Sequence, residues 1–163
     1  MRLQHEFEPI FDSNSKVLIL GSFPSVKSRE QKFYYGHPQN RFWRLLAMIY
    51  NTQIPQTVEE KKTLCLSNGI ALWDVIKACE IVGSSDSSIR NAEVNDLSII
   101  LNCCDIKEIF VNGGTAYRLF VKYQQDTINR TAVKLPSTSP ANAAWSLERL
   151  YGEWKKVRLL VEL

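Results

Sequence analysis

The stretch KVLILG, residues 16–21, predicts the first strand of a parallel β-sheet. Val17 to Leu20 form an apolar run without a polar interruption, which is typical of a strand buried on both faces. The loop GSFPSVKSREQKFYYGHPQNRFW, residues 21–43, follows at once and carries polar and aromatic residues that the fold alone does not demand. Because α/β proteins bind ligands beyond the carboxyl ends of their strands, we expect this loop to form part of a ligand site.

A helix is expected after this loop, since Pro38 can occupy a first helical position. This prediction puts Asn40 in the first turn of the helix. The residues that recur behind it at helical spacing are Phe42, Leu45, Leu46, Ile49 and Tyr50.

The middle of the chain predicts a second helix and a second strand. Residues 57–60, TVEE, have the form of a capping box, and 68–69, Asn-Gly, are a helix-ending signal. Residues 70–76, IALWDVI, then read as a probable central strand with Asp74 near its carboxyl end.

Further strands and helices alternate to the end of the chain. We expect a mobile loop at 83–90, a helix capped by Asn95 and ending near Cys104, a strand at 106–112, a glycine turn at 113–115 opening a helix, a strand at 132–135, and a helix from about Asn142. Residues 157–163 fit a helix or a strand. The alternation predicts an α/β fold with a parallel sheet covered on both faces by helices.

The composition is that of an ordinary globular protein. The 163 residues suit one domain, 1–163, and no apolar run reaches membrane-spanning length. No secretory signal is visible, so we expect a cytoplasmic monomer. The net charge of +3 does not show whether the partner is a polyanion. Five basic residues in or beside the loop at 21–43 could face phosphates or only solvent: Lys27, Arg29, Lys32, Arg41 and Arg44.

The four cysteines form no CxxC pair. Only two histidines are available as further metal ligands, so we expect reduced, buried thiols rather than a metal site. We expect no metal and no cofactor.

Five segments in order, GSFPS, YYGHPQNRFW, GIALWD, FVNGGTA and LPSTSPANA, resemble the uracil-DNA glycosylase superfamily across almost the whole chain. The closest resemblance is to the hypoxanthine-DNA glycosylase branch. It implies a three-layer α/β/α fold with a four-stranded parallel sheet. It also implies a monofunctional enzyme of base excision repair, which flips a damaged base out of DNA and hydrolyses its glycosidic bond.

Two departures narrow the resemblance. Many relatives carry an Asp or Asn that positions water two residues after the first glycine, where this chain has Phe23. The hypoxanthine branch uses instead the Asn of HPxNxFW, which is Asn40 here. Uracil-specific relatives have a base-contacting His where this chain has Leu135, which counts against activity on uracil.

The resemblance makes Asn40 the catalytic residue. An amide does not titrate near neutral pH, so it would hold the water through its oxygen rather than act as a base. The alternative is that Asn40 only caps the helix start. Around the base, the resemblance implies that Gly21 lets the backbone approach and that the peptide groups of Ser22 and Phe23 bind the base edge. The ring of Phe23 or Tyr35 would stack on the base or belong to the core; Phe33, Phe42 and Trp43 are expected in the core.

Asp74 could accept the N1 hydrogen of hypoxanthine, or it could cap the next turn. The hydroxyls of Ser137, Thr138 and Ser139 predict a phosphate clamp beside a helix N-terminus, or ordinary capping. Further DNA contacts are expected from Pro24, Ser25, Ser28 and Asn142.

The sequence therefore predicts a DNA glycosylase acting on DNA with a deaminated base, and hypoxanthine is the base that we expect. Two alternatives stay open: a mismatch-specific uracil or thymine glycosylase of the same fold, and a non-catalytic DNA-binding module.

Overall fold

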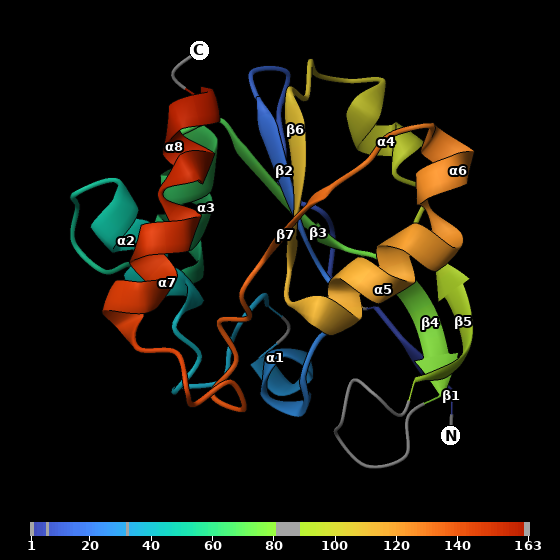
Figure 1. Ribbon diagram of the computed structural model, residues 1–163, viewed down its shortest axis with the longest axis horizontal. Helices are drawn as coiled ribbons and strands as arrows, with labels where there is room; N and C mark the ends of the chain where they lie inside the picture. Colours follow the sequence, from blue (N-terminus) through green and yellow to red (C-terminus); the bar gives the residue numbers. More distant parts are fainter. Residues whose placement is uncertain (1, 6, 32, 81–88, 162–163) are drawn as a thin grey trace.

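The protein is a three-layer α/β structure, described by a computed structural model for residues 2–5, 7–31, 33–80 and 89–161 (Figure 1). Its central sheet is four-stranded and parallel, in the order β3-β2-β6-β7. The strands are β2 (Val17–Gly21), β3 (Ile70–Asp74), β6 (Glu108–Asn112) and β7 (Val133–Leu135). The predicted fold class is confirmed.

The apolar runs form the centre of this sheet. All of β2 and β3 is buried, as expected for strands covered on both faces. The register pairs Gly21 with Asp74 at the ends of β2 and β3, and Asn112 with Leu135 at the ends of β6 and β7. The polar segments that follow the four strands therefore meet at one edge of the sheet.

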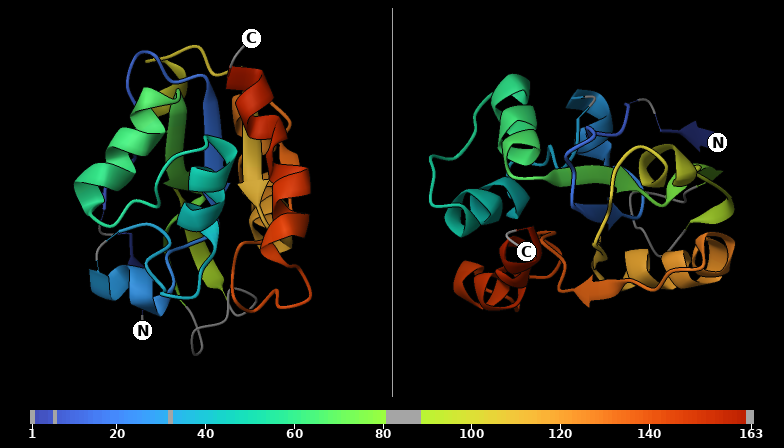
Figure 2. Two further views of the ribbon diagram at one scale, coloured as in Figure 1. Left: turned by 90° about the vertical axis from the view of Figure 1, so that its left-hand side faces the viewer. Right: turned by 90° about the horizontal axis from the view of Figure 1, so that it is seen from above.

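Helices cover both faces of the sheet (Figure 2). The α3 helix lies on one face, while α5, α7 and α8 lie on the other. The helices are α1 (Val26–Gln31), α2 (Phe42–Ile49), α3 (Val58–Ser67), α4 (Ser98–Leu101), α5 (Gly114–Tyr123), α6 (Gln125–Ile128), α7 (Leu147–Trp154) and α8 (Lys156–Val161). Residues 157–161 thus continue as helix, which settles the open alternative for that part of the C-terminal segment.

The prediction of one central strand at 70–76 is wrong in two respects. The β3 strand is an edge strand of the parallel sheet. The strand structure is interrupted at Val75, before β4 (Ile76–Glu80). The β4 strand joins a separate antiparallel sheet, ordered β1-β4-β5, with β1 (Arg2–Gln4) and β5 (Arg90–Val94). At the break, the Val75 N–H donates to the Gly21 carbonyl.

Asn95 connects the residues on both sides of Val75 instead of capping a helix. Its buried amide donates to the carbonyls of Asp74 (2.9 Å) and Ile76 (3.2 Å). The α4 helix begins later than predicted, and the Asp96 carboxylate accepts the N–H of Ser98 at its start. A long-range contact therefore overrode a local capping signal.

Two other helix starts also differ from the prediction. The α2 helix begins at Phe42, so Asn40 precedes it rather than lying in its first turn. The last segment becomes helical only at Leu147, where the Ser146 hydroxyl accepts the Arg149 N–H. By contrast, the α3 cap is confirmed, because Thr57 Oγ1 accepts the Glu60 N–H.

The remaining sequence predictions have mixed outcomes. The predicted mobile loop, 83–90, lies almost wholly outside the described residues. Cys65 and Cys79 are buried as expected, but Cys103 is exposed and Cys104 is half-buried. Among the described residues, no helix is long and apolar enough to cross a membrane.

Candidate active site

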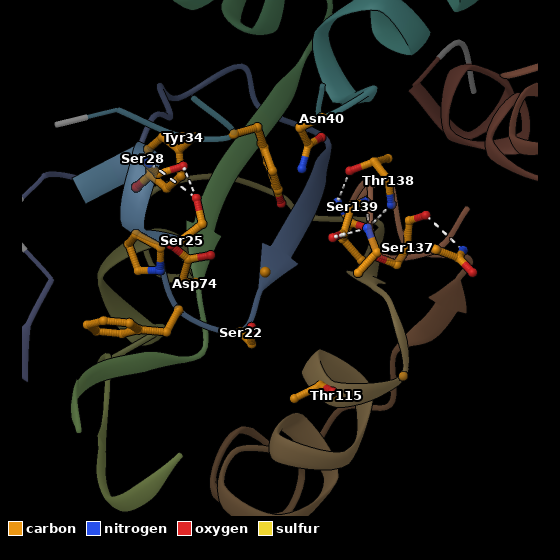
Figure 3. A pocket seen from close by; sticks show the side chains of 18 of the residues that line it. Ser22, Ser25, Ser28, Tyr34, Asn40, Asp74, Thr115, Ser137, Thr138 and Ser139 are labelled. Atoms are coloured by element: carbon orange, nitrogen blue, oxygen red, sulfur yellow. Dashed lines mark hydrogen bonds between the residues drawn. The ribbon is translucent and has the colours of Figure 1, made fainter. Parts of the chain in front are cut away.

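A cleft of about 680 Å³ opens where the strands of the parallel sheet end. Asn40 lies between a group around Asp74 on one side and Ser137 to Ser139 on the other (Figure 3). The structure brings every predicted site residue to this cleft: Asn40, Gly21, Ser22, Phe23, Tyr35, Asp74, Pro24, Ser25, Ser28, Ser137, Thr138, Ser139 and Asn142. These residues come from segments far apart in the sequence, so the topology assembles them.

Asn40 turns its amide in a defined direction. Its Oδ1 accepts the N–H of Phe42 at 2.9 Å, and only the oxygen of the amide can accept that hydrogen. Both roles considered for Asn40 are therefore compatible, since the oxygen supports the helix start and keeps a second lone pair. The His37 carbonyl accepts the Asn40 N–H, which fixes the backbone of this turn.

Gly21 and Asp74 are in close contact on the cleft floor. A Cβ placed on Gly21 would overlap Asp74 Oδ1 and would lie 3.2 Å from the Tyr35 hydroxyl. Only glycine leaves room for the carboxylate here. Asp74 is 4% exposed, and its Oδ2 is 2.7 Å from His5 Nε2, so one carboxylate oxygen bonds a histidine side chain.

The aromatic residues of the cleft divide into core and wall. Phe33, Phe42 and Trp43 are buried in the core, as predicted, and Phe23 is also buried while lining the cleft. Tyr35 stacks on Phe42 with ring centroids 4.1 Å apart. Its φ of 53° is rare for a bulky residue and costs on the order of 1–3 kcal/mol, which is typical of functional sites.

The opposite wall is the loop after β7. Thr138 is fully buried, and Asn112 holds it through two hydrogen bonds: Asn112 Nδ2 to Thr138 Oγ1 (3.0 Å) and Thr138 N–H to Asn112 Oδ1 (3.1 Å). The hydroxyls of Ser137 and Ser139 accept the N–H groups of Ser139 and Ala141. Because α7 begins only at Leu147, this segment is a turn-rich loop and not the start of a helix as predicted.

Arg41 fastens this loop to the segment that carries Asn40. Its guanidinium donates to the carbonyls of Ser139 (2.8 Å), Asn142 (3.1 Å) and Trp145, and more weakly to that of Thr138 (3.4 Å). The expectation that Arg41 faces phosphate or solvent is therefore wrong. Four carbonyls take up the hydrogen-bonding capacity of a planar guanidinium instead.

The serines of the first loop also have structural partners. Ser25 Oγ accepts the N–H of Ser28 at the start of α1, and its own hydroxyl donates to Ser28 Oγ. Ser28 is buried, and its Oγ accepts the Gly36 N–H at 2.9 Å. Ser28 therefore ties α1 to the loop that leads to Asn40.

Several residues that line the cleft were not among the predicted site residues: Phe7, Tyr34, Asn112, Gly114, Thr115 and Ala141. The NGGT turn was a usable signal for Asn112 and Thr115, because it follows a strand directly. Nothing in the local sequence singles out Phe7. In the part of the chain that the structure describes, no group of three or more His, Cys, Asp or Glu side chains could hold a metal ion.

A parallel sheet with a polar cleft at the carboxyl ends of its strands places the protein in the α/β class of ligand-binding enzymes. A family model described as the uracil DNA glycosylase superfamily matches residues 8–162. The chain therefore belongs to the uracil DNA glycosylase superfamily, and its class of activity is that of a DNA glycosylase.

The chain is similar to known proteins both in sequence and in structure. A hypoxanthine DNA glycosylase of Methanosarcina acetivorans is 35% identical over 156 residues, covering 95% of this chain and 98% of that protein. A hypoxanthine DNA glycosylase of Methanosarcina barkeri is 38% identical over 109 residues, covering 66% and 69%. The solution NMR structure of a candidate uracil DNA glycosylase from M. acetivorans superposes with a TM-score of 0.84 at 34% identity and full coverage of both chains.

Proposed function

We propose that the protein is a monofunctional DNA glycosylase that removes hypoxanthine from DNA. The observation that carries this proposal is that Asn40 and Asp74 meet on one cleft, in a chain 35% identical to a hypoxanthine DNA glycosylase. DNA is the partner, and the target base would leave the stack to enter the cleft. We further propose that the protein acts as a cytoplasmic monomer.

In the proposed reaction Asn40 positions water below the sugar. The water oxygen bonds to C1′ while the bond to the base breaks and the base takes the bonding electron pair. The proton that the water loses passes through solvent to the departing base, which leaves as the neutral base. Asn40 Oδ1 has a lone pair for the water beside the one that accepts the Phe42 N–H. Its neutral amide orients the water rather than taking the proton.

Base recognition would involve Asp74 and the peptide groups of Ser22 and Phe23. A carboxylate oxygen accepts the N1 hydrogen of hypoxanthine, and a peptide N–H donates to O6. Adenine has no N1 hydrogen, so the same carboxylate repels its N1 lone pair. Tyr35 and Phe23 line the same cleft and offer aromatic surface to the flipped base.

The DNA backbone would lie along the rim of the cleft. Ser137 and Ser139 each accept a backbone hydrogen bond, which leaves the hydroxyl hydrogen for a phosphate oxygen. Ser25, Pro24 and Asn142 would contact the strand from the two walls. Thr138 and Ser28 are buried and would act by holding these loops in shape.

The test is base release from duplexes with one inosine, uracil, xanthine or mismatched thymine. We expect hypoxanthine release without strand cleavage, and an Asn40→Ala variant should lose about 100-fold in rate because the water is no longer positioned. Preference for uracil or thymine would replace the proposed substrate. Tight binding of inosine-containing DNA without release, unchanged in Asn40→Ala, would indicate a binding module.

Thr57→Ala is the matched control for this experiment. Asn40→Ala also removes the acceptor of the Phe42 N–H at the start of α2. Thr57→Ala removes the acceptor of the Glu60 N–H at the start of α3, and Thr57 is not among the residues that line the cleft. Each loss costs about 1 kcal/mol of folding stability. Only Asn40→Ala should lower base release, and equal activity in the two variants would remove Asn40 from the mechanism.

A further inference from the structure

His5 lies behind the cleft, directly after β1. Its backbone N–H donates to the Lys77 carbonyl at 2.7 Å, which continues the pairing of β1 with β4. Its side chain is only 2% exposed and is turned toward the end of β3. There His5 Nε2 lies 2.7 Å from Asp74 Oδ2.

The two oxygens of Asp74 therefore face different surroundings. Oδ2 is bonded to His5, while Oδ1 lies against Gly21 on the floor of the cleft. The backbone of Asp74 is held separately, because the Asn95 amide donates to its carbonyl. The bond to His5 therefore fixes one of the two carboxylate oxygens.

His5 occupies an apolar aromatic environment. Its ring centroid lies 4.5 Å from that of Phe7, 5.9 Å from that of Tyr34 and 6.3 Å from that of Phe23. Its Nδ1 is buried and has no hydrogen-bond partner within the described part of the chain. A buried unpaired nitrogen costs stability, so an apolar residue would suit the packing better than histidine. What histidine adds at this position is the hydrogen bond to Asp74. This bond is strong because the surrounding side chains keep water away from it.

We propose that His5 is a positioning residue that determines base specificity by holding Asp74 with one oxygen directed at the base. This proposal rests on the proposed function. His5 Nε2–H occupies Oδ2, and Oδ1 is left as the acceptor for the N1 hydrogen of hypoxanthine. Without His5, the carboxylate can rotate and turn this acceptor away from the N1 position of the base, so the hydrogen at N1 is no longer read.

The first experiment measures kcat/KM for a duplex with one inosine and a duplex with one deoxynebularine, whose purine base lacks the N1 hydrogen and O6. His5→Leu should lower the inosine value about tenfold and reduce the preference for inosine, because a hydrogen bond to a charged group is lost. His5→Gln keeps a donor at a similar reach and should retain most of the preference. Leu3→Ala weakens the same strand without contacting Asp74 and should leave the preference unchanged.

A double-mutant cycle separates a positioning role from a structural one. In an Asp74→Asn background, His5→Leu should cause no further loss of preference, since its effect passes through the carboxylate. Equal losses in both backgrounds would overturn the proposal. So would an active His5→Leu variant with the wild-type preference.

Imidazole ¹⁵N NMR gives a readout that needs no activity. The chain has two histidines, so a His37→Gln variant identifies the His5 signals. We expect the Nε2–H form for His5, with a clear shift in Asp74→Asn, and no shift would overturn the pairing even if His5→Leu fails to fold. No hypoxanthine release by the wild-type chain would overturn the proposed function itself, whereas the NMR result and the cycle decide on His5 alone.

Discussion

Tyr34 is a buried phenol beside the His5–Asp74 pair. Its hydroxyl donates to the Glu8 carbonyl at 2.8 Å. Burial, and then the negative charge of Asp74, raise the pKa of Tyr34 well above its ordinary value of 10.0. A raised pKa means that the folded protein holds this proton more tightly than the unfolded chain does. The corresponding stability is present below pH 10 and is lost as the pH rises above it.

A Tyr34→Phe variant should therefore be less sensitive to alkali. At neutral pH it loses the bond to Glu8 and about 1 kcal/mol of unfolding free energy. Above pH 10, its stability should fall less steeply than that of the wild type, by about 1.4 kcal/mol per pH unit. Urea unfolding at pH 8 to 11 measures both effects, and parallel pH profiles for the two proteins would contradict the assignment.

At the scale of elements, Arg41 joins the turn before α2 to the loop after β7. One guanidinium donates to four carbonyls between Thr138 and Trp145, so a single side chain connects the two segments. The backbone N–H of Arg41 also donates to the Thr138 carbonyl. The turn that carries Asn40 and the loop proposed to bind phosphate are therefore joined through Arg41.

Arg41→Met should leave these carbonyls without their donor. We expect a loss of about 2–3 kcal/mol in unfolding free energy. We also expect KM for inosine-containing DNA to rise about tenfold, because the loop is no longer held. Arg44→Met is the matched control, since Arg44 is exposed and its guanidinium makes one long hydrogen bond within the described residues, to the Gln39 carbonyl at 3.4 Å. Similar KM values for the two variants would show that Arg41 does not organise the cleft.

At the scale of the whole molecule, Trp154 connects the helical layer to the site. It is fully buried on α7, packs edge-on against Phe42 of α2 with ring centroids 5.9 Å apart, and donates from Nε1 to the Pro136 carbonyl at 2.9 Å. The start of the loop after β7 is thus hydrogen-bonded to a core residue of the helices that cover the sheet. Core stability and loop geometry depend on the same side chain.

Trp154→Phe should weaken both. The smaller ring leaves a cavity and an unpaired carbonyl, which together cost about 2–4 kcal/mol. For a chain of this size, each lost kcal/mol lowers the melting temperature by about 2–4 °C. Calorimetry measures the shift in melting temperature. A variant that melts at the same temperature as the wild type would contradict the proposed role of Trp154.

The sequence by itself determined the class of fold and most of the residues that line the cleft. Apolar runs such as 17–20 are typical of covered strands, and parallel strands bring their following loops to one edge. For that reason the residues predicted from GSFPS, HPQN, Asp74 and LPSTSPAN all line one cleft. The α3 cap was also predictable, because Thr57 and Glu60 are three residues apart and interact locally.

Only the tertiary structure decided which groups hold the site residues. His5 contacts Asp74 across 69 residues, and Arg41 contacts Trp145 across 104. No periodicity or local motif records such pairs, because packing of separate elements creates them. The same packing turned Asn95 away from a helix start and toward Asp74. Local rules therefore predict where the site lies, while long-range contacts set how its side chains are turned.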